Sequence, residues 1–219
     1  MGEDRSATQA RVRNRRGEGA RLREEIVAAA VGLLEETGDE SAITLRSVAR
    51  RVGIAAPSIY RHFPDQPAIM LAVVRDAFTD LDELLRTAMD AAGDEPRARL
   101  MALCHGYLDF AAARPGRYRI MFGGLWNPDT NASSVTEEDV ATLGQVSMRR
   151  LAEALEECVA AGVATSTDLP ADAVALWIGL HGLAHQRAVS PAFRWPPDIA
   201  ERVITALAHF TDGAGASGT

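Results

Sequence analysis

The sequence contains no lysine, only two cysteines and few aromatic side chains, which make up 5% of its 219 residues. Two cysteines, Cys104 and Cys158, are too few for a disulfide framework, and both fall in apolar helical patterns. We therefore expect buried free thiols in a reducing cytoplasm. All 23 basic residues are arginine, a bias that fits a GC-rich coding sequence and predicts no function.

Features of membrane, secreted and enzymatic proteins are also missing. There is no run of about 18 apolar residues, and the N-terminal residues are polar and Arg-rich without an apolar signal segment. This pattern predicts a cytoplasmic protein with no membrane partner. No glycine-rich phosphate loop follows a strand pattern, and no Gly-x-Ser-x-Gly motif occurs, so we expect neither a cofactor nor an enzyme. An enzymatic function remains a minor alternative.

Histidine spacing offers weak evidence for a metal site. His181 and His185 are four residues apart on one helical face, while Cys104 and His105 are adjacent and therefore point apart. Because no carboxylate or thiolate completes a convincing ligand set, we expect no metal. His181 is instead predicted to pack at a dimer interface or to form a hydrogen bond near a pocket.

Charge is distributed unevenly along the chain. The net charge is −7, yet residues 1–63 carry eleven Arg against nine Asp or Glu, which is +2 and leaves −9 for the remainder. A basic end on an acidic body suits a protein that touches DNA at one end only. Residues 1–20 are predicted to be a disordered basic arm that either solvates the chain or adds salt-dependent DNA contacts, and residues 213–219 a flexible tail.

Apolar periodicity predicts an all-α fold without strands or repeats. We expect a three-helix helix-turn-helix head at 21–66 and a C-terminal helical domain for ligand binding and dimerisation at 67–212. The expected helices span 21–37, 44–53, 56–63, 67–92, 96–113, 116–123, 137–162, 171–189 and 197–211.

The second and third helices form a helix-turn-helix pattern. Thr44 is a favourable N-cap for the second helix, and Gly53 permits the left-handed backbone of a tight turn. Ile54 would then pack beneath both helices, so that the third helix can enter a major groove about 12 Å wide. Thr44 and Arg46 lie where the N-terminus of the second helix can meet a phosphate. The outer face of the third helix is predicted to present Ser58, Tyr60, Arg61 and His62.

The stretch from Thr44 to Asp65 is similar to the N-terminal pattern of the TetR family, and its most specific part is the Tyr60-Arg61-His62-Phe63 block. The resemblance implies a DNA-binding regulator of double-stranded, near-palindromic operators. It also implies phosphate contacts from Thr44, Tyr60 and His62, and base contacts near Pro57, Ser58 and Arg61. Two positions depart from the family: Ala55 replaces the usual Ser or Thr cap of the recognition helix, and Gln66 replaces a common Lys.

The C-terminal part resembles a TetR-type ligand domain with a Trp-x-x-x-His-Gly motif, here Trp177, His181 and Gly182. Large apolar side chains gather in this part of the sequence and predict a pocket between helices, although any single one can equally be core. The candidate ligand-binding residues are Tyr107, Phe110, Met121, Phe122, Trp126, Met148, Trp177 and His181.

The last two expected helices carry more apolar residues than one core-facing stripe needs, which predicts a homodimer joined through a four-helix interface. The combined interpretation is a repressor that leaves its operator when a small apolar or amphipathic effector binds the body. The alternatives are an activator, a regulator without a small-molecule effector, or a ligand-binding protein that does not bind DNA.

Overall fold

The computed structural model describes residues 18–123, 126 and 128–211, and these residues form helices and no strand. Most of the expected basic arm and the expected tail at 213–219 lie outside the described residues. The first helix, α1 (Glu18–Thr37), nevertheless starts at Glu18, so residues 18–20 are helical and the prediction of disorder was wrong for them. The all-α prediction is confirmed.

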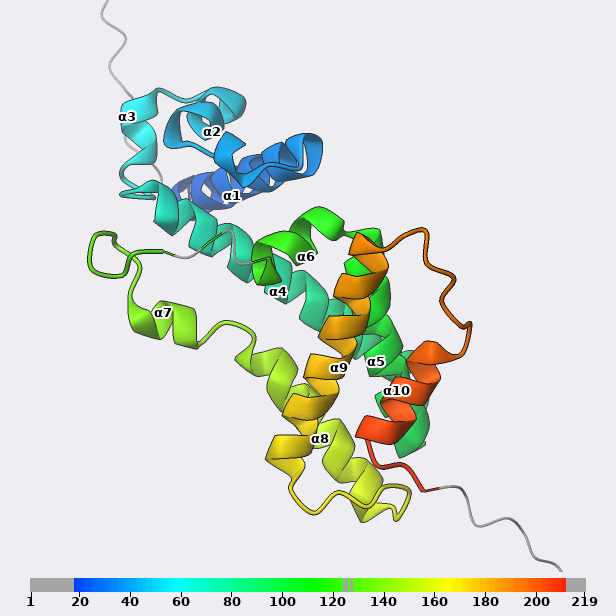
Figure 1. Cartoon of the computed structure of the whole chain (residues 1–219). Helices are drawn as coiled ribbons and strands as arrows, with labels where there is room; N and C mark the ends of the chain where they lie inside the picture. The colour runs from blue at the N-terminus through cyan, green and yellow to red at the C-terminus, as the bar shows by residue number, and fades with distance from the viewer. Residues whose placement is uncertain (1–17, 124–125, 127, 212–219) are drawn as a thin grey trace, which may run out of the picture.

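The head consists of α1, the short 3-10 helix η1 (Glu40–Ala42), α2 (Leu45–Val52) and α3 (Ala56–Ile59). These helices gather at one end of the long helix α4 (Gln66–Ala91), which runs on into the body (Figure 1). Asp65 begins α4, because its side chain accepts a hydrogen bond from the Ala68 amide at 2.9 Å.

Among the described residues, the body contains α4 together with six further helices. They are α5 (Pro96–Ala113), α6 (Pro115–Phe122), α7 (Glu137–Ala141), α8 (Gln145–Ala160), α9 (Leu169–Val189) and α10 (Ile199–Leu207). The single helix expected at 137–162 is interrupted at Gly144, which has a φ of +73°. A Cβ on Gly144 would lie 2.9 Å from the Phe78 ring. The break therefore allows α8 to approach α4 closely.

Two hydrophobic cores lie along α4. Its first half, including Ile69 and Val73, is buried in the core of the head, and its second half, including Leu81 and Leu85, is buried in the core of the body. Ile120 of α6 is also part of the head core. Both α4 and α6 therefore belong to the head and to the body at once.

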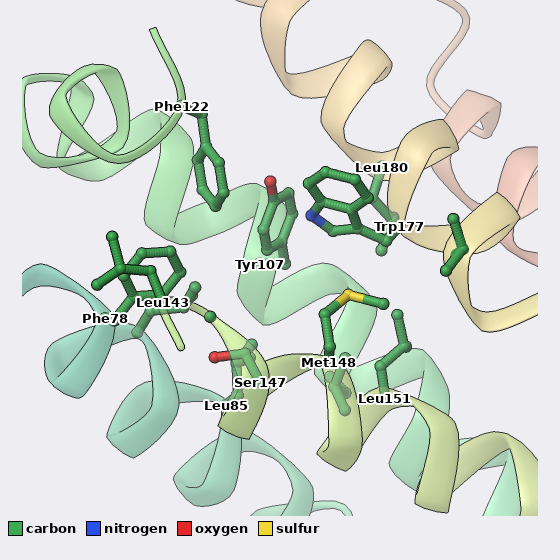
Figure 2. Close-up of a pocket in the computed structure, with 14 residues that line it drawn as sticks. Phe78, Leu85, Tyr107, Phe122, Leu143, Ser147, Met148, Leu151, Trp177 and Leu180 are labelled. Atoms are coloured by element: carbon green, nitrogen blue, oxygen red, sulfur yellow. The ribbon is translucent and has the colours of Figure 1, made fainter. Parts of the chain in front are cut away.

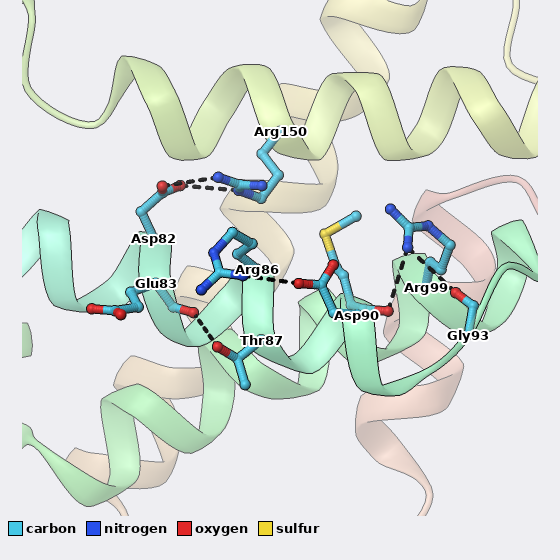
Figure 3. A network of polar contacts seen from close by, with 9 residues as sticks. Asp82, Glu83, Arg86, Thr87, Asp90, Gly93, Arg99 and Arg150 are labelled. Carbon is cyan, nitrogen blue, oxygen red and sulfur yellow. Dashed lines mark hydrogen bonds and ion pairs between the residues drawn. The ribbon is translucent and has the colours of Figure 1, made fainter.

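Ion pairs fix the helices around α4 in place. The Arg150 guanidinium of α8 donates two hydrogen bonds, of 3.0 and 2.9 Å, to the Asp82 carboxylate of α4 (Figure 3). Such bidentate pairs are geometrically specific. At the junction of head and body, the Arg117 guanidinium on α6 lies 3.1 Å from Glu35 of α1 and 2.8 and 2.6 Å from Asp76 and Asp80 of α4. Arg117 thus joins the first helix of the head to two helices that continue into the body.

Candidate nucleic-acid interface and ligand cavity

The turn between α2 and α3 has the geometry that the sequence predicts. The Thr44 side chain accepts a hydrogen bond from the Ser47 amide at 3.1 Å, and the Ser47 hydroxyl accepts one from the Thr44 amide at 2.9 Å. This capping box starts α2, and Gly53 ends it with a φ of +75°. Ala55 gives α3 no side-chain cap, and α3 is a single helical turn, shorter than the helix expected at 56–63.

The segment after α3 is a turn held by buried anchors. Ile59 and Phe63 are almost completely buried, while Tyr60 between them is 55% exposed. Arg61 is exposed and His62 is half-buried. The backbone thus directs Tyr60 and Arg61 outwards from a fixed hydrophobic base.

Most of the expected DNA-binding side chains reach the surface of the head: Thr44, Arg46 and Pro57 are exposed, as are Tyr60 and Arg61. Ser58 is different, because it is only 8% exposed and belongs to the inner side of α3. The expectation that Ser58 lies on the outer face is therefore wrong. Ser58 and Ile59 together form the buried side of the single turn of α3.

A further arginine on the exposed side of α2 was not singled out from the sequence. Arg50 is exposed like Arg46, and the charge pattern of the segment is the signal that points to it. Arg51, by contrast, is held by Glu36 of α1 through two hydrogen bonds of 2.6 Å each. Arg51 therefore fixes α2 against α1.

The body encloses an apolar cavity of about 290 Å³ between α4, α5, α6, α8 and α9 (Figure 2). None of the residues that line it carries a charge at neutral pH. They are Phe78, Leu81, Leu85, Leu103, Tyr107, Phe122, Leu143, Gly144, Ser147, Met148, Leu151, Val174, Trp177 and Leu180. This volume lies just below the usual range for small-molecule sites, about 300–1,000 Å³.

Four of the eight candidate ligand residues line this cavity, namely Tyr107, Phe122, Met148 and Trp177. The other four lie elsewhere. Phe110 is completely buried in the body core, and Met121 packs against both cores. Trp126 packs against the head core, and its buried indole N–H has no hydrogen-bond partner among the described residues. His181 does not line the cavity, but its ring packs against those of Phe122 and Trp177, which do.

His181 connects two tyrosines. Its Nδ1 lies 2.8 Å from the Tyr118 hydroxyl and 3.2 Å from the Tyr107 hydroxyl. Burial lowers the pKa of His181, and the nearby His185 lowers it further. Burial also raises the pKa of Tyr107 and Tyr118. All three side chains are therefore uncharged at neutral pH.

Some lining residues were missed in the sequence. Phe78 and Ser147 come from α4 and α8, and they meet at the cavity only because the chain breaks at Gly144. A glycine inside an apolar helical pattern was the one available signal.

A helix-turn-helix head joined through a shared long helix to a helical body is the architecture of a DNA-binding transcriptional regulator. A family model described as "Bacterial regulatory proteins, tetR family" matches residues 26–73, and one described as "Tetracyclin repressor-like, C-terminal domain" matches residues 100–210. The chain belongs to the tetR family of bacterial regulatory proteins. The Trp-x-x-x-His-Gly subgroup stays a prediction.

Individual relatives support the same family. The nucleoid occlusion factor SlmA of Vibrio campbellii is 31% identical over 104 residues, which cover 46% of this chain and 51% of that protein. The HTH-type transcriptional regulator Mb1846 of Mycobacterium bovis is 26% identical over 124 residues, or 56% of this chain and 50% of that protein. The chain thus spans about half the length of the curated relatives it matches.

Solved structures match nearly the whole chain. A protein of unknown function from Rhodococcus sp. RHA1 has a TM-score of 0.69 at 28% identity, covering 91% of this chain and 95% of its own. The fatty acid degradation regulator FadR of Bacillus halodurans shares the fold, with a TM-score of 0.66 at 14% identity over 90% of this chain and 97% of its own. Among the described helices, none has the length and apolar character needed to cross a membrane.

Proposed function

We propose that this protein is a homodimeric transcriptional repressor that binds a near-palindromic operator through its two heads and releases it when a small, mainly apolar effector enters the body cavity. The observation that supports this most directly is the position of the cavity. Its walls include α4 and α6, and the same two helices contribute Ile69, Val73 and Ile120 to the head core. A ligand that displaces either helix acts on the head without touching DNA.

Helix α6 connects the cavity to the head. Phe122 of α6 lines the cavity, and Arg117, also on α6, holds Glu35 of the head. A ligand needs only to favour a spacing of the two heads that no longer fits two successive major grooves. An activator, or a regulator whose body only dimerises, would share the fold but not this ligand response.

Filling the cavity with a side chain tests the ligand response. Ser147→Trp on α8 places an indole in the cavity from its partly exposed edge. We expect affinity for the DNA upstream of the gene to fall by about 5- to 150-fold, the usual range of coupling between two sites. Fluorescence anisotropy measures this affinity.

The matched control is Gln145→Trp, because Gln145 is exposed on the same helix and is not part of the cavity wall. Its operator affinity should equal that of the wild type. If Ser147→Trp also binds DNA like the wild type while its cavity is shown to be filled, the body serves dimerisation only.

Head substitutions separate phosphate contacts from base contacts. Tyr60→Phe removes an exposed hydroxyl and should weaken binding to operator and to unrelated DNA by a similar factor, about ten-fold, because a hydrogen bond to a charged phosphate is lost. Arg61→Ala should mainly reduce the ratio of specific to non-specific affinity, by about 1–3 kcal/mol.

Arg86→Ala is the control for Arg61→Ala, since Arg86 is an exposed arginine paired with Asp90 in the body. Arg86→Ala should change neither the affinity for the operator nor the affinity for unrelated DNA. Binding by Tyr60→Phe that matches the wild type on both DNAs at moderate salt would show that Tyr60 makes no phosphate contact.

A further inference from the structure

Five rings pack together at one end of the cavity, and three of them, those of Tyr107, Phe122 and Trp177, line it. Phe122 and Trp177 lie with ring centroids 5.1 and 5.6 Å from that of His181, and Tyr118 stacks on His181 at 5.6 Å. The Tyr107 ring lies 6.2 Å from Phe122, and Figure 2 shows its hydroxyl between Phe122 and Trp177. The polar atoms of this end are therefore few and fixed in place by packed rings.

His181 cannot accept a hydrogen bond from both tyrosine hydroxyl groups at once. A neutral imidazole offers one lone pair, on one of its two nitrogens, and two phenolic hydroxyls approach the same Nδ1 of His181. Tyr118 is the nearer donor at 2.8 Å, against 3.2 Å for Tyr107. The other tautomer, with a hydrogen on Nδ1, would leave both hydroxyl hydrogens unused by His181.

The hydrogen that remains belongs to Tyr107. Tyr118 also lies 3.4 Å from the His181 carbonyl oxygen, a contact too long to compete with the one at 2.8 Å. Without a ligand, the Tyr107 hydroxyl can donate to the oxygen of Tyr118 beside it. A carbonyl oxygen is a better acceptor than a phenol oxygen, so a ligand carbonyl can draw this hydrogen to itself.

The described part of the cavity wall would not neutralise a charged ligand. None of its residues is charged, and Arg150, two residues after the lining residue Met148 on α8, is already paired with Asp82. A buried carboxylate would therefore lose its hydration without gaining a counter-charge.

We propose that the cavity binds an uncharged aromatic compound with a hydrogen-bond acceptor such as a ketone, whose oxygen accepts from the Tyr107 hydroxyl, and that Tyr118 leaves this donor available by occupying His181 Nδ1. This inference rests on the proposed function, which makes the cavity the effector site. Tyr118 is then a positioning residue, because it does not line the cavity and acts through His181.

Three probes of similar shape test the proposal by isothermal titration calorimetry on the full chain: 2-acetylnaphthalene, 2-isopropylnaphthalene and 2-naphthoate. The ketone should bind the wild type about five-fold more tightly than the hydrocarbon, because its oxygen is a better acceptor for the Tyr107 hydroxyl than the Tyr118 oxygen that it replaces. The carboxylate should bind at least about ten-fold more weakly than the hydrocarbon.

Two isosteric variants separate contact from positioning. Tyr107→Phe should bring the affinity ratio of ketone to hydrocarbon to about one. Tyr118→Phe should lower the same ratio, because Tyr107 then donates to His181, while hydrocarbon affinity stays unchanged. Loss of packing alone would weaken all probes equally. Arg86→Ala is the control and should keep the wild-type ratio, because Arg86 is exposed and does not line the cavity.

Equal binding of ketone and hydrocarbon to the wild type would overturn the inference, and so would an unchanged ratio in Tyr107→Phe. If Tyr118→Phe does not fold, as judged by circular dichroism, the affinity ratio of ketone to hydrocarbon in Tyr107→Phe alone tests the inference. Probes that bind without discrimination refute only this inference, whereas failure of all three to bind removes the effector site and the proposed function with it.

Discussion

Replacing Ile178 with arginine should convert the protein to a monomer that binds its operator at least about a hundred-fold more weakly. Ile178 is 57% exposed on α9, and Val174 on the same helix is 43% exposed. Open space lies beyond Gly182, where no atom is within 4 Å of an added Cβ, so another helix can approach closely. Exposed apolar surface of this kind on α9 is the surface we propose to be covered by a second copy.

The large loss follows from the geometry of recognition. One head alone buries too little surface for a tight specific complex, so each monomer would retain mostly non-specific affinity. Sedimentation velocity measures the assembly state and anisotropy the operator affinity. Val140→Arg is the control, because Val140 is 37% exposed on α7. An Ile178→Arg protein that remains dimeric would place the interface elsewhere.

Phe110→Ala should cost about 3–5 kcal/mol of the free energy of unfolding, the usual range for removing a fully buried phenylalanine. Phe110 has no exposed surface and lies in the body core, with the Arg114 guanidinium 5.4 Å from its ring centroid. Urea denaturation at fixed protein concentration measures this cost, because the proposed dimerisation would make stability depend on concentration.

Met148→Ala provides the comparison for Phe110→Ala. Met148 is partly exposed and borders the cavity, so its truncation enlarges an existing space and should cost clearly less. A cost below about 1 kcal/mol for Phe110→Ala would mean that the core rearranges around the missing ring.

The head could be predicted from sequence because local interactions determine it. The N-cap at Thr44 and the left-handed Gly53 are effects of near neighbours in the chain, and both were expected, whereas the reciprocal hydrogen bond to the Ser47 hydroxyl was not. Ser58 was misplaced for the opposite reason. Its burial in α3 depends on how α3 packs through Ile59 into the head core, which no local pattern specifies.

The cavity was predicted as a kind of site but only partly as a set of residues. Aromatic and sulfur-containing side chains indicated a pocket, yet residue type does not distinguish a wall from a core. Phe110 and Tyr107 lie on the same helix, and only Tyr107 lines the cavity. Which side chains line the cavity depends on how α8 and α4 pack around Gly144. This packing involves contacts between segments far apart in the sequence.

The sharing of α4 and α6 between the two cores affects how such regulators can be recombined. A cut at residue 66 would leave the head without Ile69, Val73 and Ile120, which are almost completely buried in its core. A chimera that joins this head to another body must therefore carry over the first half of α4 and a matching α6. It also needs an arginine at position 117 to meet Glu35, so new sensors would be built by redesigning the cavity wall within this chain rather than by exchanging whole modules.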